Sequence, residues 1–534
     1  MRVPGVNRDQ TPLSELTESR RRRVLVVMCL SLALVVSGVS SLNGALPALA
    51  RDTGASQTTL TWIVDVYTLL LAGLLLPLGA VGDRFGRRQA LVVGLAIYFG
   101  SSLPAVLVDS TDALIVCRAV SGVAAALIMP ATLSIITNTF GPDQRSRAVG
   151  LWAGVAGASG GFGVVLSGAL LEAFSWRSIF LVNTLLSAAI LLVALRSVPA
   201  TRGRSDVPLD PAGAFFSVLG LTALVYAIIS GGEDGWLRAE TLGAALLGAV
   251  ALAQFVVLEL RSEHPLLHIR LFRVAGFSSG ALMVTLQFFS LFGFLFVALQ
   301  YLQDVRGYSP FVAGLATLPF ALPTMVAAPM SPALATRFGF RRLTMLGFGL
   351  MVAAFLVLAQ AGVGTSFGWF ALGLVLFGFG FGLTTTPATT TIVSSLPPER
   401  QGMASSVNDV AREFGGAVGI AVFGSLLTSL YSGGVETIAR TLPQTAQDGA
   451  RESITAAIEI ARSAGPAGKA LAQQAQSSFV DGMSVALYVA AAILAAGTLV
   501  LARTTRHAST DQGVEVAESP YPDEPEEARE ALAA

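Results

Sequence analysis

The sequence contains few charged side chains and few of the residues that build reactive sites. Only 13% of its 534 residues are charged, whereas 53% are hydrophobic, and the mean hydropathy is +0.68. A soluble chain could not bury this much apolar surface, so we expect an all-α polytopic protein of the lipid bilayer. The formal net charge is zero, which leaves no basic excess to favour a nucleic-acid partner.

The sequence lacks the residues that a metal site, a nucleotide-binding loop or covalent catalysis would need. The cysteines, Cys29 and Cys117, lie inside apolar runs, and the three histidines form no cluster, so we expect neither a metal nor another cofactor. The single lysine, Lys469, is followed by Ala470, whereas a Walker loop requires Ser or Thr there. This excludes an ATP-driven pump, and the lack of intramembrane lysines argues against a respiratory proton-relay subunit. No nucleophile with a matching base suggests an enzyme.

Long apolar runs dominate the rest of the chain. A membrane-spanning helix needs about 20 mostly apolar residues, and such runs recur from end to end. We expect fourteen transmembrane helices, at residues 24–46, 60–81, 89–108, 113–137, 148–171, 178–197, 211–231, 241–260, 277–302, 310–335, 343–361, 367–393, 403–431 and 482–502.

Arginine indicates on which side of the membrane each connection lies. Alternate connections are rich in it, namely those with Arg20 to Arg23, Arg84, Arg87 and Arg88, Arg145 and Arg147, Arg202 and Arg204, Arg270 and Arg273, and Arg337, Arg341 and Arg342. By the positive-inside rule, we expect a multi-pass protein of the plasma membrane with both termini in the cytoplasm. No cleavable signal peptide is evident, because the first apolar run is too long.

An internal repeat indicates two similar halves. The segment Arg84-Phe-Gly-Arg-Arg88 is echoed by Arg337-Phe-Gly-Phe-Arg-Arg342, as expected of transporters built from parallel repeats. The expected parts are a cytoplasmic N-terminal tail (1–23), an N-terminal six-helix bundle (24–197), an inserted helix pair with its loops (198–275), a C-terminal six-helix bundle (276–503) and a disordered cytoplasmic tail (504–534).

One connection is far longer than the others. Residues 432–480, expected to be external, contain two weakly amphipathic stretches, 453–462 and 468–475, separated by Gly465-Pro466. This pattern favours two helices with a turn between them. The segment is either a folded hairpin over the outer mouth of the protein or a spacer.

A short charged segment joins the second and third expected spans. Its notable residues are Gly79, Asp83, Arg84, Gly86, Arg87 and Arg88. Glycines allow a tight turn, and Asp83 can pair with a neighbouring helix end in one conformation and release it in another. We expect a structured loop that acts as a gate; the alternative is a solvated turn whose arginines only fix topology.

Several segments, in this order, resemble the major facilitator superfamily and, within it, the fourteen-helix drug:proton antiporter family. They are Gly79–Arg88, Arg118 with Gly122, Ser175–Phe180, Pro265–Phe272, Tyr301–Tyr308 and Gly402–Arg412. The resemblance covers nearly the whole chain. It implies a major facilitator fold, a monomer, and export of a small lipophilic or cationic substrate in exchange for protons.

Two positions depart from the family pattern. Members often carry an aspartate five residues before an Asn-x-Ala-Leu-Pro stretch, and here Gly38 precedes Asn43-Gly-Ala-Leu-Pro47. The helix-5 antiporter motif normally contains Gly-Pro, and here Val164 follows Gly163. The first departure removes proton chemistry from helix 1, and the second removes the proline bend while the glycine-rich character stays.

Acidic residues inside the spans are the main candidates for proton and cation binding, because an ionisable group at a helix centre costs roughly 2.5 to 3.5 kcal/mol or more. Asp65 is expected about one turn inside the outer end of its helix, where it can bind a proton or attract a cation. The resemblance agrees, since an acid at this position recurs among family exporters of hydrophobic cations. Alternatively, Asp65 bonds to hydroxyls and only orients helices.

Three further charged residues are candidates for proton coupling. Asp409 and Glu413 lie four residues apart and so share a helix face near mid-membrane, beside Arg412. They can exchange a proton for a cationic substrate; alternatively, Asp409 only neutralises Arg412 and leaves Glu413 at a cavity edge. The resemblance assigns Arg118 to proton coupling, and snorkelling at a helix end is its structural alternative.

Aromatic rings are candidates for the walls of a substrate cavity, where cation–π attraction favours a lipophilic cation. The candidates are Trp62, Tyr67, Phe288, Phe289 and Phe292, with Asn43 as a polar candidate. The alternative is that these rings only face lipid or neighbouring helices.

We therefore expect a secondary active exporter of hydrophobic or cationic drug-like compounds, driven by protons. A dedicated exporter of one endogenous antibiotic or metabolite is the first alternative, and uptake by symport is the second. A non-transporting membrane sensor is the third, indicated only by Gly38 and Val164.

Overall fold

The computed structural model describes residues 17–43, 45–53, 55, 57–199, 209–233, 235–262, 264–396 and 401–511. The first nine helices are α1 (Glu18–Asn43), α2 (Leu46–Thr53), α3 (Gln57–Phe85), α4 (Arg87–Leu107), α5 (Thr111–Thr139), α6 (Pro142–Ala173), α7 (Arg177–Ser197), α8 (Pro211–Glu233) and α9 (Ala239–Arg261). The others are α10 (Ala275–Gln300), α11 (Pro310–Ala316), α12 (Leu318–Phe338), α13 (Phe340–Leu358), α14 (Phe367–Ser394), α15 (Gln401–Ala439), α16 (Gln444–Glu452), α17 (Ile454–Ser463) and α18 (Lys469–Asp511). Within these ranges, fourteen helical segments are long and apolar enough to cross a membrane, which confirms the expected number.

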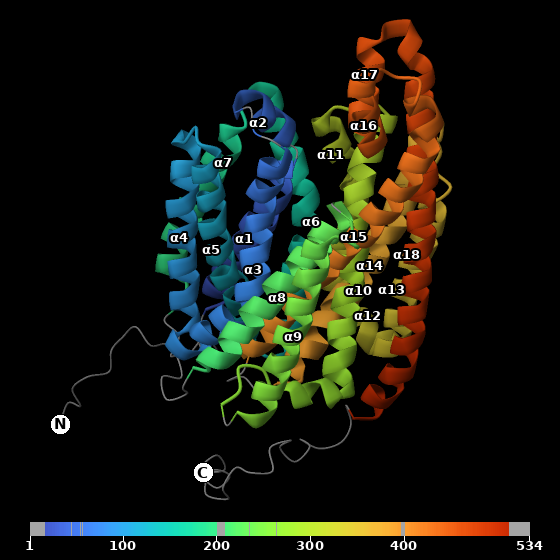
Figure 1. Cartoon of the computed structure of the whole chain (residues 1–534). Coiled ribbons are helices and arrows are strands. Elements are labelled where there is room, and N and C mark those ends of the chain that lie inside the picture. Colours follow the sequence, from blue (N-terminus) through green and yellow to red (C-terminus); the bar gives the residue numbers. More distant parts are fainter. Residues whose placement is uncertain are drawn as a thin grey trace, which may run out of the picture.

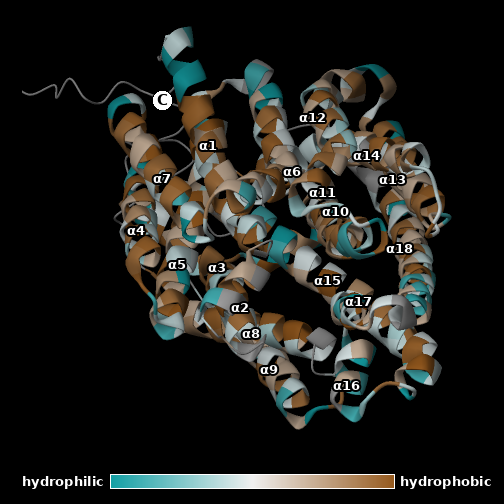
Figure 2. Cartoon of the chain, turned by 90° about the horizontal axis from the view of Figure 1, so that it is seen from above, coloured by the Kyte–Doolittle hydropathy of each residue, from teal (hydrophilic) through white to brown (hydrophobic). Residues whose placement is uncertain are grey.

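The helices gather into two groups with an additional pair between them (Figure 1). We call α1 and α3 to α7 the N-terminal half, and α10 to α15 with α18 the C-terminal half. Helices α8 and α9 form the inserted pair, and α8 packs against both α3 and α15. Seen from above, α8 lies beside α3 along one side of the molecule (Figure 2). The inserted pair therefore bridges the two halves.

The two ends of the bundle differ in character. Helix α1 begins and α18 ends at the same end, the lower one in Figure 1, while α16 and α17 lie at the opposite end. We call the first the basic end, because Arg84, Arg87, Arg341 and Arg342 lie at helix boundaries there. The other is called the hairpin end.

Helix α6 brings the two halves into close contact. It is a continuous helix of 32 residues with proline only at its start. A Cβ atom at Gly150 would lie 2.9 Å from the carbonyl oxygen of Ala328 on α12, and one at Gly168 would lie 2.7 Å from the backbone nitrogen of Phe311 on α11. Glycine therefore allows α6 to approach the other half backbone to backbone near both of its ends.

The helices on either side of the expected external loop extend into it. Helix α15 continues to Ala439 and α18 begins at Lys469, so the stretch 468–475 mostly belongs to α18. The helix expected at 453–462 is confirmed as α17, and α16 was not expected. Apolarity shows only where a helix lies in lipid, whereas good helix formers such as Ala, Gln and Leu continue α18 beyond it.

Residues 440–468, which we call the hairpin segment, fold onto the C-terminal half. The hydroxyl of Tyr431 on α15 donates to the carbonyl oxygen of Ala450 at 3.0 Å, and Arg451 lies 2.7 Å from a carboxylate oxygen of Glu436. The hydroxyl of Thr455 donates to the carboxylate of Asp304 at 2.9 Å. The segment is thus a folded structure rather than a spacer, while its place over an outer mouth stays a prediction.

Helices α1 and α18 both extend into the expected tails. Helix α1 begins at Glu18 inside the expected tail 1–23, where Arg22 pairs with Glu18 at 2.8 Å one helical turn away. Helix α18 continues to Asp511 inside the expected disordered tail 504–534. Residues 1–16 and 512–534 lie outside the described part of the chain.

Candidate functional site

A cavity of about 190 Å³ lies between the two halves. Residues of α1, α3, α8, α10 and α15 line it. Its apolar lining consists of Val39, Val64, Ile228, Ile229, Phe292, Phe296, Ala417, Ile420 and Ala421 with the glycines Gly416 and Gly424, and its polar lining consists of Asp65, Thr68 and Glu413. None of these lining residues is basic. The cavity therefore combines apolar walls with two carboxylates, which suits an apolar molecule that carries positive charge.

The two carboxylates come from different halves of the molecule. Asp65 lies eight residues after the start of α3, about 12 Å along the helix, because α3 begins at Gln57. It therefore lies about two turns inside the helix rather than the expected one. Glu413 lies about 18 Å along α15 from Gln401 by the same rise. Both side chains are partly buried, and the fold brings them to one cavity.

Asp409 and Arg412 form a buried pair on α15, apart from the cavity lining. Asp409 is fully buried and Arg412 is 2% exposed, and the guanidinium nitrogen lies 3.8 Å from the carboxylate oxygen. The side-chain amide of Asn408 donates to the same oxygen at 3.3 Å. Of the two expected arrangements, the structure places Asp409 against Arg412 and Glu413 on the cavity wall.

The Arg412 guanidinium also contacts aromatic rings of both halves. Its central carbon lies 4.5 Å from the ring centroid of Phe288 on α10 and 6.0 Å from that of Trp152 on α6. The indole of Trp152 donates to Thr132 on α5 at 3.0 Å. Away from water, cation–π contacts of this kind are worth about 2 kcal/mol. Arg412 is therefore a contact between the halves.

Arg118 on α5 is buried in the N-terminal half and does not snorkel to the membrane surface, which corrects the expected structural alternative. Its guanidinium donates to the carbonyl oxygens of Ile63 at 3.0 Å and Gly38 at 3.2 Å, and it lies 4.2 Å from the ring centroid of Tyr67. Main-chain carbonyls accept from two of its nitrogens, which offsets part of the cost of burying the cation, while the nitrogen Nη2 has no hydrogen-bond partner within the described part of the chain. Arg118 thus holds α5 against α1 and α3.

Gly38 occupies the position at which family members often carry an aspartate. A Cβ atom at Gly38 would lie 2.3 Å from the hydroxyl oxygen of Tyr98 on α4. The space that a side chain would need is therefore filled by a tyrosine. A carboxylate on α1 at this position would therefore require Tyr98 to move.

The aromatic candidates lie in different environments. Phe292 lines the cavity, as expected. Phe288 and Phe289 are buried against Phe381 and Phe423 respectively. Tyr67 is fully buried and its hydroxyl donates to the carbonyl oxygen of Val35 at 3.1 Å.

Trp62 is 40% exposed and stacks on Tyr226 of α8, with ring centroids 6.1 Å apart. The side chain of Asn43 lies outside the described part of the chain. Of the six expected cavity residues, Phe292 is therefore the one that the structure places on this cavity wall.

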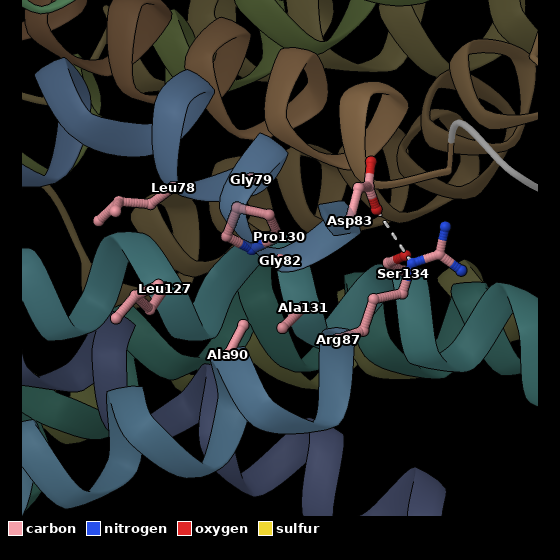
Figure 3. A pocket seen from close by; sticks show the side chains of 10 residues that line it. All are labelled: Leu78, Gly79, Gly82, Asp83, Arg87, Ala90, Leu127, Pro130, Ala131 and Ser134. Carbon is pink, nitrogen blue, oxygen red and sulfur yellow. Dashed lines mark hydrogen bonds and ion pairs between the residues drawn. The ribbon is translucent and has the colours of Figure 1, made fainter. Parts of the chain in front are cut away.

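The charged segment from Gly79 to Arg88 is mostly helix rather than loop. Helix α3 continues to Phe85, and α4 begins at Arg87. Gly86 alone makes the turn, with a φ of 107° that is unfavourable for other residues. Figure 3 shows Asp83 at the end of α3 pointing at Arg87, whose guanidinium nitrogen lies 3.1 Å from the Asp83 carboxylate.

Two other parts of this segment fix neighbouring helices. Gly79 and Gly82 lie against Pro130 and Ala131 of α5 in a small pocket (Figure 3). Arg88 donates to the carbonyl oxygen of Leu195 on α7 at 2.9 Å. The segment therefore joins α3, α4, α5 and α7 at the basic end.

Sequence reasoning missed part of the cavity wall. Val39 and Thr68 lie inside apolar runs, and Ile228 and Ile229 lie in the inserted pair, which no motif connected to the site. Nothing in their residue types distinguishes them from lipid-facing neighbours. Only the packing of α1, α3, α8 and α15 around the cavity reveals them.

Comparisons with known proteins agree on one family. The family model described as Major Facilitator Superfamily matches residues 28–420. The multidrug efflux pump LfrA of Mycolicibacterium smegmatis is 35% identical over 495 residues, which are 92% of this chain and 97% of LfrA. The methyl viologen resistance protein SmvA of Salmonella typhimurium is 33% identical over 483 residues, which are 89% of this chain and 96% of SmvA.

A solved structure supports the fold. A bacterial homologue of the human lysosomal transporter Spinster, in an inward-facing and unoccupied conformation, matches with a TM-score of 0.58 and 17% identity. The match covers 92% of this chain and 99% of that structure. At this identity the similarity concerns the arrangement of the helices alone.

Proposed function

Since this chain belongs to the major facilitator superfamily, as its motifs predicted, we propose that it exports lipophilic or cationic drugs across the plasma membrane in exchange for protons. The efflux pump and the methyl viologen resistance protein among its relatives support drug export. Methyl viologen is a flat dication, which suits a cavity with two carboxylates. We place both termini in the cytoplasm, because the basic end holds the arginine-rich connections, and we propose a monomer.

The observation that carries this proposal is the apolar cavity that Asp65 and Glu413 share. When both carboxylates are ionised, they attract a cation; when protons neutralise them, the attraction ends and the substrate leaves. Since the two acids belong to different halves, a rocking motion of the halves changes their separation. Asp409 and Arg118 would support this exchange by keeping Arg412 and the N-terminal helices in place.

Proton flux in proteoliposomes that contain a pH dye tests this function. We expect methyl viologen and tetraphenylphosphonium to trigger proton movement through the purified protein, whereas anions of similar size do not, because the cavity lining is acidic and apolar. Liposomes without protein provide the control. If no cation triggered proton movement although the protein was shown to be folded, this result would contradict drug:proton exchange. It would favour a narrow endogenous substrate or a sensor.

We further propose that the segment from Gly79 to Arg88 is a gate, since Asp83 and Arg87 pair across the one-residue turn at Gly86. Asp83→Asn keeps the shape of the side chain but removes this ion pair. We expect the maximal transport rate to fall about threefold to tenfold with KM nearly unchanged, because a gate affects the conformational step rather than binding.

Asp448→Asn is the matched control for the gate, because Asp448 is 83% exposed on α16 and pairs with Arg451 at the surface. Initial rates of methyl viologen export measure both variants. A maximal rate of Asp83→Asn equal to that of the control would reduce the segment to a topological signal.

A further inference from the structure

We propose that α8 of the inserted pair is part of the substrate site, and that Ile228 and Ile229 determine which cations fit. This inference rests on the proposed function. Both isoleucines line the same cavity as Asp65 and Glu413. The remaining lining comes from α1, α3, α10 and α15, so α8 supplies the wall that neither half provides.

Contacts with the N-terminal half fix α8 in this position. Trp62 of α3 stacks on Tyr226 of α8, with an interplanar angle of 25°. At Gly73 of α3, a Cβ atom would lie 2.2 Å from the hydroxyl oxygen of Thr222, so the Thr222 side chain of α8 fills the space that a side chain on α3 would need. Ile228 and Ile229 therefore belong to a helix that packs closely against α3.

Contacts with the C-terminal half close the same wall. Leu69, Ala72 and Val225 form an apolar cluster that Ile229 joins together with Ala417 of α15. Beyond α8, the indole nitrogen of Trp236 donates to the hydroxyl of Ser425 on α15 at 2.8 Å. Ser425 follows Gly424, which lines the cavity. Because this cavity wall contacts both halves, its shape has to change when the halves move relative to each other.

The chemistry of this wall favours discrimination by size and shape. Asp65 and Glu413 attract positive charge without regard to the rest of the molecule, whereas Ile228, Ile229 and Phe292 contact the apolar part of the substrate. Two β-branched side chains have few rotamers and form a stiff surface. Their volume therefore limits how bulky a cation the cavity accepts.

The first test compares a flat and a bulky cation. In proton-flux measurements with the parent, Ile228→Ala and Ile229→Ala, we expect the ratio of apparent affinities for methyl viologen and tetraphenylphosphonium to change about tenfold, because each buried methylene contributes roughly fourfold. Val250→Ala on α9 is the control, since Val250 is 59% exposed and does not line the cavity. An unchanged ratio in both isoleucine variants would overturn the inference.

A second measurement separates substrate contact from a structural effect. In a background of Cys29→Ala and Cys117→Ala, the reaction rate of Ile229→Cys with a membrane-permeant maleimide is followed with and without tetraphenylphosphonium. We expect the cation to slow this reaction severalfold and to leave Val250→Cys unaffected. Equal rates would assign α8 a purely structural role.

The two measurements fail in different ways. If the parent moves no protons, the proposed function fails, and the protection measurement still decides whether α8 contacts a bound cation. If the parent exchanges protons but neither readout changes, the proposed function holds and the inference about α8 is wrong.

Discussion

Replacing Glu413 with glutamine is expected to reduce cation-triggered proton flux by about tenfold or more, because an amide can neither bind nor release a proton at the cavity wall. Glu413 lines the cavity on α15, and Gln preserves its size.

Asp65→Asn is expected to weaken cation binding about tenfold to a hundredfold, since it removes a charge-assisted contact, and to affect neutral substrates less. Proton flux and export are measured side by side for both variants.

Asp112→Asn is a suitable control for these two variants, because Asp112 is an exposed acid in the first turn of α5. Its flux should equal that of the parent. Equal selectivity profiles of Asp65→Asn and the parent would remove Asp65 from the cation site. Undiminished proton flux in Glu413→Gln would show that Glu413 does not bind the transported proton, and would assign that role to Asp409 or another residue.

Gly168→Val is expected to lower the maximal transport rate about tenfold. A side chain at Gly168 on α6 would meet the backbone nitrogen and Cα of Phe311 at 2.7 Å, and backbone atoms cannot swing aside as a side chain can. The variant therefore has to separate α6 from α11, which costs about 1 to 3 kcal/mol for overpacking of this kind. The substitution would therefore favour the conformation in which α6 and α11 are separated, and this bias would slow the transport cycle.

Initial export rates, with size-exclusion profiles to verify folding, measure this effect. Gly160→Ala on the same helix is the control, because the nearest atom to its Cβ would be a Leu295 methyl carbon at 3.8 Å, an ordinary contact. If Gly168→Val transported as fast as Gly160→Ala, the approach of α6 to α11 would have no part in the transport cycle.

The sequence predicts the number of spans and the family well, because both depend on patterns that are local. Runs such as 89–108 have a clear apolar signature, and α4 matches it within two residues. The acids Asp65 and Glu413 were also identifiable, since ionisable groups within spans are rare. Their common cavity was not, because it depends on how α3 and α15 pack.

Other features depend on contacts that no sequence pattern indicates. The bonds from Arg118 to the carbonyl oxygens of Gly38 and Ile63 involve main-chain atoms, which every residue carries. The wall formed by Ile228 and Ile229 has the residue type of any lipid-facing helix. The part of α18 before the expected span mixes apolar residues such as Leu471 with polar ones such as Gln473 and Gln474, so hydropathy did not include it.

The start of α18 also offers a practical consequence for single-molecule work. Lys469 is the only lysine of the chain, and it is exposed at the hairpin end, where α18 begins. Apart from the terminal α-amine, an amine-reactive fluorophore therefore has one side chain to attach to. That point lies away from the cavity and at the end opposite to the start of α1, so the unmodified sequence can be tethered, tracked or paired with a second dye without removing any cysteine.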